Sequence, residues 1–320
     1  MSSSAVTTRR VSMDLLKNPV VISYAVLGLT WLLAVLFVGG FASWSSNQQL
    51  IRTASYLGII AIGQTLVIMM GGIDLSVSGV VALAAVVCAQ VRADLNSPAA
   101  MLIALLVCAL VGAANATGIV LLRLPPIVMT LASGTIISGA LLVYTDGQPR
   151  SAHISVLDWL ANDSLLGIPV VLVAWLLLTA ILWWLLHRSR YGRYGEALGS
   201  MLPASLASGV PVAATTFVMY IGCAVMAGVS GLILLGFTGT SSLTMGEPYQ
   251  LLSIAAVVLG GTSILGGRGH VAGSVSGALL LTLIVALLTS WDIGEAQRRV
   301  AQGLLLIGLL LFYAREKADR

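Results

Sequence analysis

The chain has 320 residues, of which 58% are hydrophobic and 9% are charged, with a formal net charge of +4 and a mean hydropathy of +1.01. Soluble globular chains carry about 25% charged residues. These values therefore exclude an ordinary soluble enzyme, a disordered protein and a disulfide scaffold, and they predict an integral membrane protein. The basic residues lie between long apolar runs and are not gathered with aromatic residues on one face, so nucleic acid is not an expected partner.

Long apolar runs follow one another along the whole chain. A transmembrane helix needs about 20 mostly apolar residues, because the hydrocarbon core of a bilayer is roughly 30 Å thick. Ten runs are candidates: 20–41, 53–71, 74–91, 98–121, 126–144, 168–187, 211–236, 249–266, 270–290 and 299–314. The predicted fold is an all-α bundle of about ten transmembrane helices, formed by one transmembrane domain (20–314) between an N-terminal tail (1–19) and a C-terminal tail (315–320).

The basic residues indicate how the spans are oriented. If ten spans alternate from a cytoplasmic N-terminus, 11 of the 16 Lys and Arg residues fall on the cytoplasmic side and 5 fall outside. Basic residues favour the cytoplasmic side, so we expect a multi-pass protein with both termini in the cytoplasm. The longest outer segment, 145–167, contains a stretch at 156–160 that is typical of a short amphipathic helix at the membrane surface.

A first glycine-rich interruption separates the second and third runs, where Gly71 and Gly72 stand without a hydrophilic loop. Asp74 follows and precedes an apolar helix, so we expect its carboxylate to accept backbone N–H bonds as the N-cap of that helix. Alternatively, the glycines break a span within the membrane and Asp74 lines a pathway, since a broken helix is tolerated at depth only beside a cavity or within protein. The two interpretations are compatible.

Uncharged polar residues also lie within predicted spans, among them Gln64 in the second run, Asn115 in the fourth and Gln302 in the tenth. Such groups most often form hydrogen bonds to neighbouring helices. They can equally face a wet pathway and contact hydroxyl groups of a substrate. The sequence leaves both interpretations open.

A second glycine-rich interruption contains Gly260, Gly261 and Gly267. Its simplest interpretation is a tight turn with close backbone packing, because glycine accepts positive φ. Arg268 is then a cytoplasmic anchor. The alternative is that Arg268 lies at a cytoplasmic gate or on a surface that meets a partner.

Signatures of catalysis and of bound cofactors are missing. The chain has no H-E-x-x-H and no G-x-S-x-G motif, and the stretch 261–268 lacks the Lys-Ser/Thr pair of a phosphate loop. Its three cysteines lie in apolar runs without metal-ligand spacing. The ionisable residues Asp74, Glu247 and Asp292 fall at the ends of predicted spans, which argues against a carrier that couples to an ion gradient. We expect no cofactor or metal on this chain.

Three stretches together resemble one family. Residues 63–78 match the pattern GxTLVIxxGGIDLSVG with Ser78 at the last glycine, residues 255–269 match AAVVLGGTSLxGGRG with one or two changes, and residues 190–212 match the family's basic loop more loosely. They are similar to the permease subunits of bacterial ribose-type ABC importers, in the branched-chain amino acid/ribose permease superfamily. The resemblance covers about residues 50 to 310. In the loop, Pro203 departs from the family's pattern.

The resemblance implies a transport subunit and not an enzyme. The expected activity is ATP-driven import of a monosaccharide or related polyol across the bacterial cytoplasmic membrane. The implied partners are an ABC ATPase that uses ATP and Mg²⁺, a periplasmic or lipid-tethered sugar-binding protein, a second permease copy or paralogue, and membrane lipid. The alternatives are a branched-chain amino acid permease of the same superfamily, an ion-coupled secondary carrier and a membrane scaffold without transport activity.

The resemblance also implies that the basic segment 187–210 docks on the ATPase through a short coupling helix. The residues that correspond to the family's pattern in this loop are Arg190, Gly192, Arg193, Glu196 and Gly199. The charged side chains among them are expected to supply polar contacts to the ATPase. The alternative is a solvated loop held by anionic lipid head groups.

Overall fold

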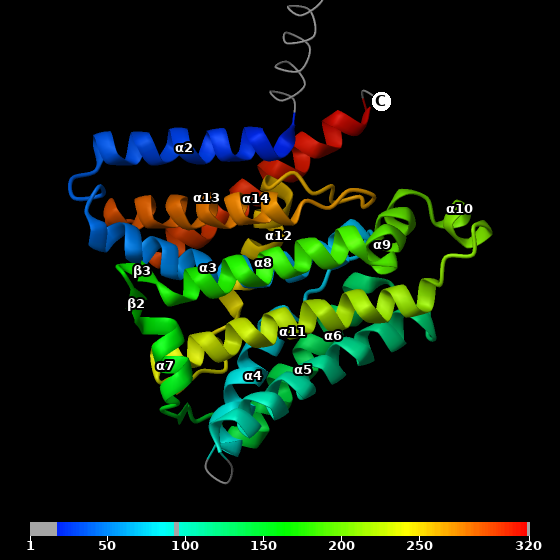
Figure 1. Ribbon diagram of the computed structural model, residues 1–320, viewed down its shortest axis with the longest axis horizontal. Coiled ribbons are helices and arrows are strands. Elements are labelled where there is room, and N and C mark those ends of the chain that lie inside the picture. Colours follow the sequence, from blue (N-terminus) through cyan, green and yellow to red (C-terminus); the bar gives the residue numbers. More distant parts are fainter. Residues whose placement is uncertain (1–17, 93–95, 319–320) are drawn as a thin grey trace, which may run out of the picture.

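The computed structural model describes residues 18–92 and 96–318, and these form a helical bundle with two short strand pairs (Figure 1). The predicted all-α class is confirmed. The elements in chain order are α2 (Pro19–Phe37), α3 (Trp44–Met69), α4 (Val77–Val91), α5 (Ser97–Val120), α6 (Pro126–Thr145), β1 (Arg150–Ser151), α7 (Ser155–Asn162), β2 (Ser164–Leu165), β3 (Ile168–Pro169), α8 (Val170–Arg188), α9 (Arg190–Ser200), α10 (Leu202–Ala207), α11 (Val212–Thr238), β4 (Thr240–Ser241), α12 (Glu247–Leu259), α13 (Val271–Ser290) and α14 (Glu295–Ala318).

Each of the ten predicted runs contains a helix, but ten full-length spans are not confirmed. Among the described residues, seven helices are long and apolar enough to cross a membrane: α2, α3, α5, α6, α8, α11 and α13. α4 and α12 have only 15 and 13 residues, or about 22 and 20 Å at 1.5 Å per residue, which is less than the thickness of the hydrocarbon core. α14 covers the tenth run and extends to Ala318, so most of the predicted C-terminal tail is helical.

α4 and α12 are short because both begin inside the bundle. Gln250 in the first turn of α12 donates through Nε2 to the carbonyl of Leu75, just before α4, at 2.8 Å. Gly246 precedes α12 and lies so close to the carbonyl of Ser78 that a Cβ would collide with it. The first turns of these two helices therefore lie side by side, and from there α12 runs toward α9.

α11 forms the centre of the bundle, where it packs against α3, α4, α5 and α7. Glycines allow the close approach. A Cβ on Gly112 of α5 would lie 2.6 Å from the carbonyl oxygen of Tyr220, and one on Gly63 of α3 would lie 2.8 Å from Cβ of Met226. Trp175 of α8 is fully buried and lies directly against Gly58 of α3.

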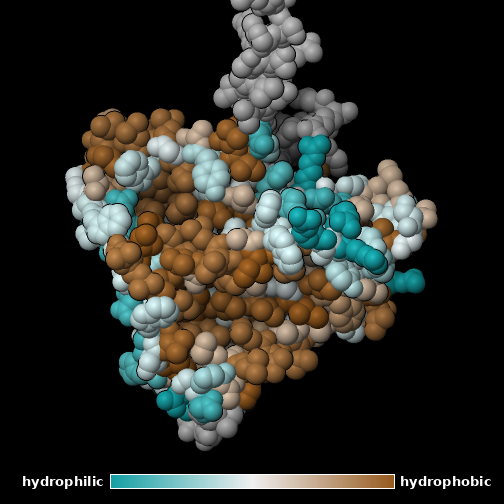
Figure 2. Space-filling view, viewed as in Figure 1, coloured by the Kyte–Doolittle hydropathy of each residue, from teal (hydrophilic) through white to brown (hydrophobic). Residues whose placement is uncertain are grey.

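The two ends of the bundle differ in character. At one end, called the α7 end, α7 confirms the helix expected at 156–160, β1 pairs antiparallel with β4, and β2 pairs with β3. At the opposite end, called the α9 end, α9 and α10 connect α8 to α11 (Figure 1). Figure 2 shows an apolar surface between the two ends and hydrophilic side chains gathered at them. The molecule thus has the belt expected of a membrane protein.

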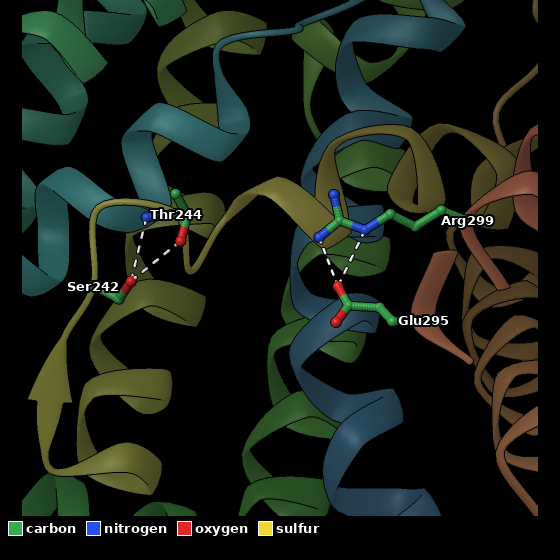
Figure 3. Close-up of polar contacts among 4 residues, drawn as sticks. All are labelled: Ser242, Thr244, Glu295 and Arg299. Atoms are coloured by element: carbon green, nitrogen blue, oxygen red, sulfur yellow. Dashed lines mark hydrogen bonds and ion pairs between the residues drawn. The ribbon is translucent and has the colours of Figure 1, made fainter. Parts of the chain in front are cut away.

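The termini fall partly outside the described residues. The basic residues of the N-terminal tail, Arg9, Arg10 and Lys17, lie outside them, and so do the side chains of the predicted C-terminal tail. The first turn of α14 is described and contains an i,i+4 ion pair between Glu295 and Arg299, with 2.7 Å between Oε1 and Nη2 (Figure 3). The cytoplasmic placement of both termini stays a prediction.

Replacement of Gly112 by Ala tests the close contact between α5 and α11. The added methyl group would overlap the backbone at Tyr220, so we expect a loss of about 1–3 kcal/mol of stability from overpacking. Thermal unfolding of the purified protein in detergent measures the change as a lower Tm. Gly139→Ala on α6 is the matched control, because nothing lies within 4 Å of its Cβ position. Equal Tm values for the two variants would contradict the packing.

Candidate functional site

The first interruption is a helix end followed by an unwound segment. α3 ends at Met69, and Gly71 adopts φ +86°, a conformation that favours glycine. The N–H groups of Gly71 and Gly72 donate back to the carbonyls of Ile68 and Val67 at 2.8 and 3.0 Å, which satisfies carbonyls that the helix end leaves free. The predicted break at Gly71 and Gly72 is confirmed.

Buried side chains from other parts of the bundle satisfy the unwound backbone. Gln64 of α3 donates through Nε2 to the carbonyl of Asp74 at 2.6 Å. Thr130 of α6 donates to the carbonyl of Ile73 at 3.2 Å and accepts from the N–H of Leu75 at 3.0 Å. Gln64 thus forms a hydrogen bond to the unwound segment, whereas the sequence reasoning missed Thr130 and Gln250.

Asp74 orders the turn that leads into α4. Its carboxylate accepts a backbone N–H at the start of the helix, as the sequence predicts, although the residue directly before α4 is Ser76, which makes no side-chain cap bond. The Oδ1 atom of Asp74 accepts from the N–H and the hydroxyl of Ser76 at 2.8 and 2.5 Å. The carboxylate therefore accepts hydrogen bonds from the residue two positions further along the chain, as aspartate side chains do in turns.

Asn115 of α5 belongs to the same buried cluster. Its Nδ2 atom donates to the hydroxyl of Ser76 at 2.9 Å. Tyr220 of α11 places its hydroxyl beside Gly72, where a Cβ would lie 2.5 Å from it. Asp74, Asn115 and Tyr220 are fully buried, and the side-chain oxygen of Asn115 and the hydroxyl of Tyr220 have no hydrogen-bond partner among the protein atoms described. Nothing in the helical periodicity of the sequence singles out Tyr220.

The second interruption contacts the first directly. α12 ends at Leu259, and Gly261, Gly266 and Gly267 all adopt positive φ. The N–H of Gly267 donates to the carbonyl of Met69 at 2.8 Å. A Cβ on Gly266 would lie 2.9 Å from the nitrogen of Gly71. The tight turn expected here is present, and a backbone hydrogen bond joins it to the end of α3.

α9 lies over the place where the two interruptions meet. Ser189 caps it by accepting from the N–H of Gly192 at 3.2 Å. Gly192 and Gly195 are buried against the bundle. Near the end of the helix, Gly199 lies so close to Met69 and Gly267 that any side chain would collide with their backbone atoms. The glycine positions predicted from the basic loop are therefore packing positions.

The charged positions of the segment face outward. Arg190, Arg193 and Glu196 are exposed, as is Arg268 in the second interruption. Figure 2 shows the hydrophilic surface that gathers at this end of the molecule. Burial lowers the pKa of His270, opposed by the carboxylate of Glu196. The structure thus brings α9 and the second interruption together, with their cationic side chains on the surface.

α10 adds an apolar projection beside the arginines. This helix of six residues places Pro203 in its first turn, a position that proline favours, so Pro203 starts a helix there. Met201, Leu202 and Leu206 expose 62, 49 and 57% of their surface. The α9 end thus presents apolar and cationic side chains together, a combination suited to contact with another protein.

Comparisons with known proteins place these features in a family. A family described as the permease component of branched-chain amino acid transport systems matches residues 46–314. The chain is similar to the ribose import permease RbsC of Bacillus subtilis, at 34% identity over 82% of this chain and 83% of the relative. It is also 34% identical to RbsC of Escherichia coli over 73% of this chain and 74% of that protein.

A relative named for another substrate is similar too. The fructose import permease FrcC of Rhizobium meliloti is 32% identical over 82% of this chain and 76% of its own length. No solved structure matches the chain.

Replacement of Gln64 by Leu tests how the unwound segment is held. The carbonyl of Asp74 would lose its donor in a buried place, and we expect a loss of about 1–3 kcal/mol of stability. The measurement is the Tm of the purified protein in detergent. Gln49→Leu on the same helix is the control, because Gln49 is exposed. A Gln64→Leu variant as stable as this control would contradict the assignment.

Proposed function

The chain belongs to the family of branched-chain amino acid transport system permease components, and from that membership we propose that it imports a monosaccharide or related polyol as the membrane-spanning subunit of an ATP-driven transporter. The names of several relatives support the substrate class, since ribose import permeases at 34% identity and a fructose import permease at 32% identity are among them. Import of a branched-chain amino acid is the second candidate, which the name of the family supports.

The α9 end supports the proposal that a separate ATPase supplies the energy. The family makes the chain a transport subunit. α9 and α10 form the largest connection between two spans at this end, and they combine exposed Arg190 and Arg193 with the apolar Leu202 and Leu206. In the proposal, this surface docks on the ATPase. The ATPase, and not the permease, binds ATP and Mg²⁺.

The same surface gives the proposed orientation. Arg188, Arg190, Arg193 and Arg268 all lie at the α9 end, and basic residues favour the cytoplasmic side of a bacterial inner membrane. The α7 end then faces outward and receives substrate from a binding protein. A second permease, either a copy or a paralogue, would complete the central path, and lipid would surround the apolar belt.

Deletion of this gene tests the substrate class. We expect uptake of one radiolabelled pentose, hexose or polyol to fall to background and to return when the gene is supplied again, because the permease is the only route through the membrane in this proposal. Branched-chain amino acids measured in the same cells serve as the control. Loss of leucine uptake with intact sugar uptake would support the second candidate and overturn the first.

Replacement of Arg193 by Glu tests docking of the ATPase. The exposed side chain would change sign within the proposed contact surface, so we expect the ATPase to co-purify less well at moderate salt while the permease still inserts in the membrane. Arg150→Glu at the α7 end is the matched control. Unchanged co-purification of the Arg193 variant would count against docking at α9.

A further inference from the structure

Glu247 begins α12 near the middle height of the bundle. The thirteen residues of α12 run from Glu247 to Leu259, which spans about 20 Å at 1.5 Å per residue. Leu259 ends beside the second interruption at the α9 end. α3, which packs against α12, has 26 residues, or about 39 Å, and reaches from one end to the other. Glu247 is therefore about half-way along the molecule.

The contacts of α4 and α12 agree with this height. Gln250 bonds to Leu75, and Gly246 lies against Ser78 in the first turn of α4. Leu75 follows the buried Asp74, whose carbonyl accepts a hydrogen bond from Gln64. Gln64 lies in α3, five residues before the last residue of that helix. The start of α12 is thus held well inside the bundle by contacts that are independent of its length.

Glu247 is nevertheless exposed. Thr244, Glu247, Pro248 and Leu251 are all exposed, and their spacing places them on one face of α12. The stripe stops there, because every residue from 253 to 258 is buried. The surface is therefore confined to the first two turns of the helix and to the turn before it.

The carboxylate of Glu247 has no hydrogen-bond or ion-pair partner among the described residues. Their two ion pairs are His153–Asp158 and Glu295–Arg299. Figure 3 shows the second pair and, separately, the turn before α12, in which the hydroxyls of Ser242 and Thr244 lie 3.3 Å apart. An acidic residue in a first turn interacts favourably with the helix dipole, but that interaction does not explain a free charge on the surface at this height.

Lipid does not suit this surface. The helices whose broad exposed faces are apolar, α2 and α6, contain no charged residue along their whole length. A charged side chain at membrane depth is costly in hydrocarbon, and such residues face the bundle interior or a water-filled cavity. The Glu247 face is therefore unsuited to lipid, and in the proposal that follows it borders water.

We propose that Thr244, Glu247 and Leu251 line the path that substrate takes through the membrane, and that the Glu247 carboxylate accepts hydrogen bonds from hydroxyl groups of a polyhydroxylated substrate. The assignment of substrate rests on the proposed function. A carboxylate accepts stronger hydrogen bonds than a neutral oxygen does. Thr244 adds a hydroxyl that can donate and accept, and Leu251 offers an apolar contact to the C–H groups of the same molecule.

The wetness of this face is tested by cysteine labelling of the assembled transporter in membranes. Glu247→Cys is expected to react with a membrane-impermeant, negatively charged thiol reagent, applied to right-side-out and to inverted vesicles. The native cysteines are all buried, so the background is low. Leu176→Cys on α8 is the control, because Leu176 is 48% exposed on a face without charge. A Glu247→Cys variant that labels no better than this control overturns the path.

Contact with substrate is tested by Glu247→Gln. The loss of a charge-assisted hydrogen bond is expected to raise the apparent KM for uptake about tenfold or more. Glu295→Gln, which removes an exposed acid of α14, is expected to leave KM unchanged. An unchanged KM for Glu247→Gln overturns the substrate contact. A failure of the proposed function can be told apart from a failure of this inference. In the first case the wild-type transporter would import no sugar or polyol, while the labelling of Glu247→Cys would still show whether the face is wet.

Discussion

The structure depends on satisfying backbone groups where the chain is not helical but is buried. Between α3 and α4 the segment from Gly72 to Leu75 leaves helical geometry inside an apolar bundle, and an unbonded backbone group there costs several kcal/mol. The bonds come from Gln64, Thr130 and Gln250, which lie on three different helices. The helices around this segment are therefore tied to each other through it, and the polar residues of the interior lie where the backbone needs them.

The same requirement connects the interior to the surface. The carbonyl of Met69 at the end of α3 accepts from the N–H of Gly267, so the two interruptions share a hydrogen bond. Gly199 of α9 lies against both. Because no side chain separates Gly199 from the backbone of Met69 and Gly267, a shift of α9 would move the backbone at both interruptions. A force on α9 from a docked protein would thus reach the ends of α3 and α12 through packed backbone, and packed interfaces tend to switch between discrete arrangements. Glu247 lies at the other end of α12.

Local patterns in the sequence predicted what is local in the structure. Apolar runs located a helix in each predicted span, and the glycine pairs located both interruptions, because these depend on composition and backbone freedom. The start of α12 depends instead on Gly246 lying against Ser78, which are 168 residues apart (246 − 78). For the same reason Thr130, Tyr220 and Gln250 could not be identified as neighbours of Gly71–Ser76. The resemblance found the glycines of α9, and only the fold shows what they touch.

The placement of charge changes one argument about energy. From the sequence, Asp74 and Glu247 lie at the ends of spans, and the lack of ionisable residues at mid-membrane argues against an ion-coupled carrier. In the structure Asp74 is buried within the bundle and Glu247 begins a helix near mid-height. That argument therefore loses its force. What separates an ATP-driven permease from a self-powered carrier is the family to which the chain belongs, together with α9, a helix packed on both interruptions that keeps its arginines free for a partner.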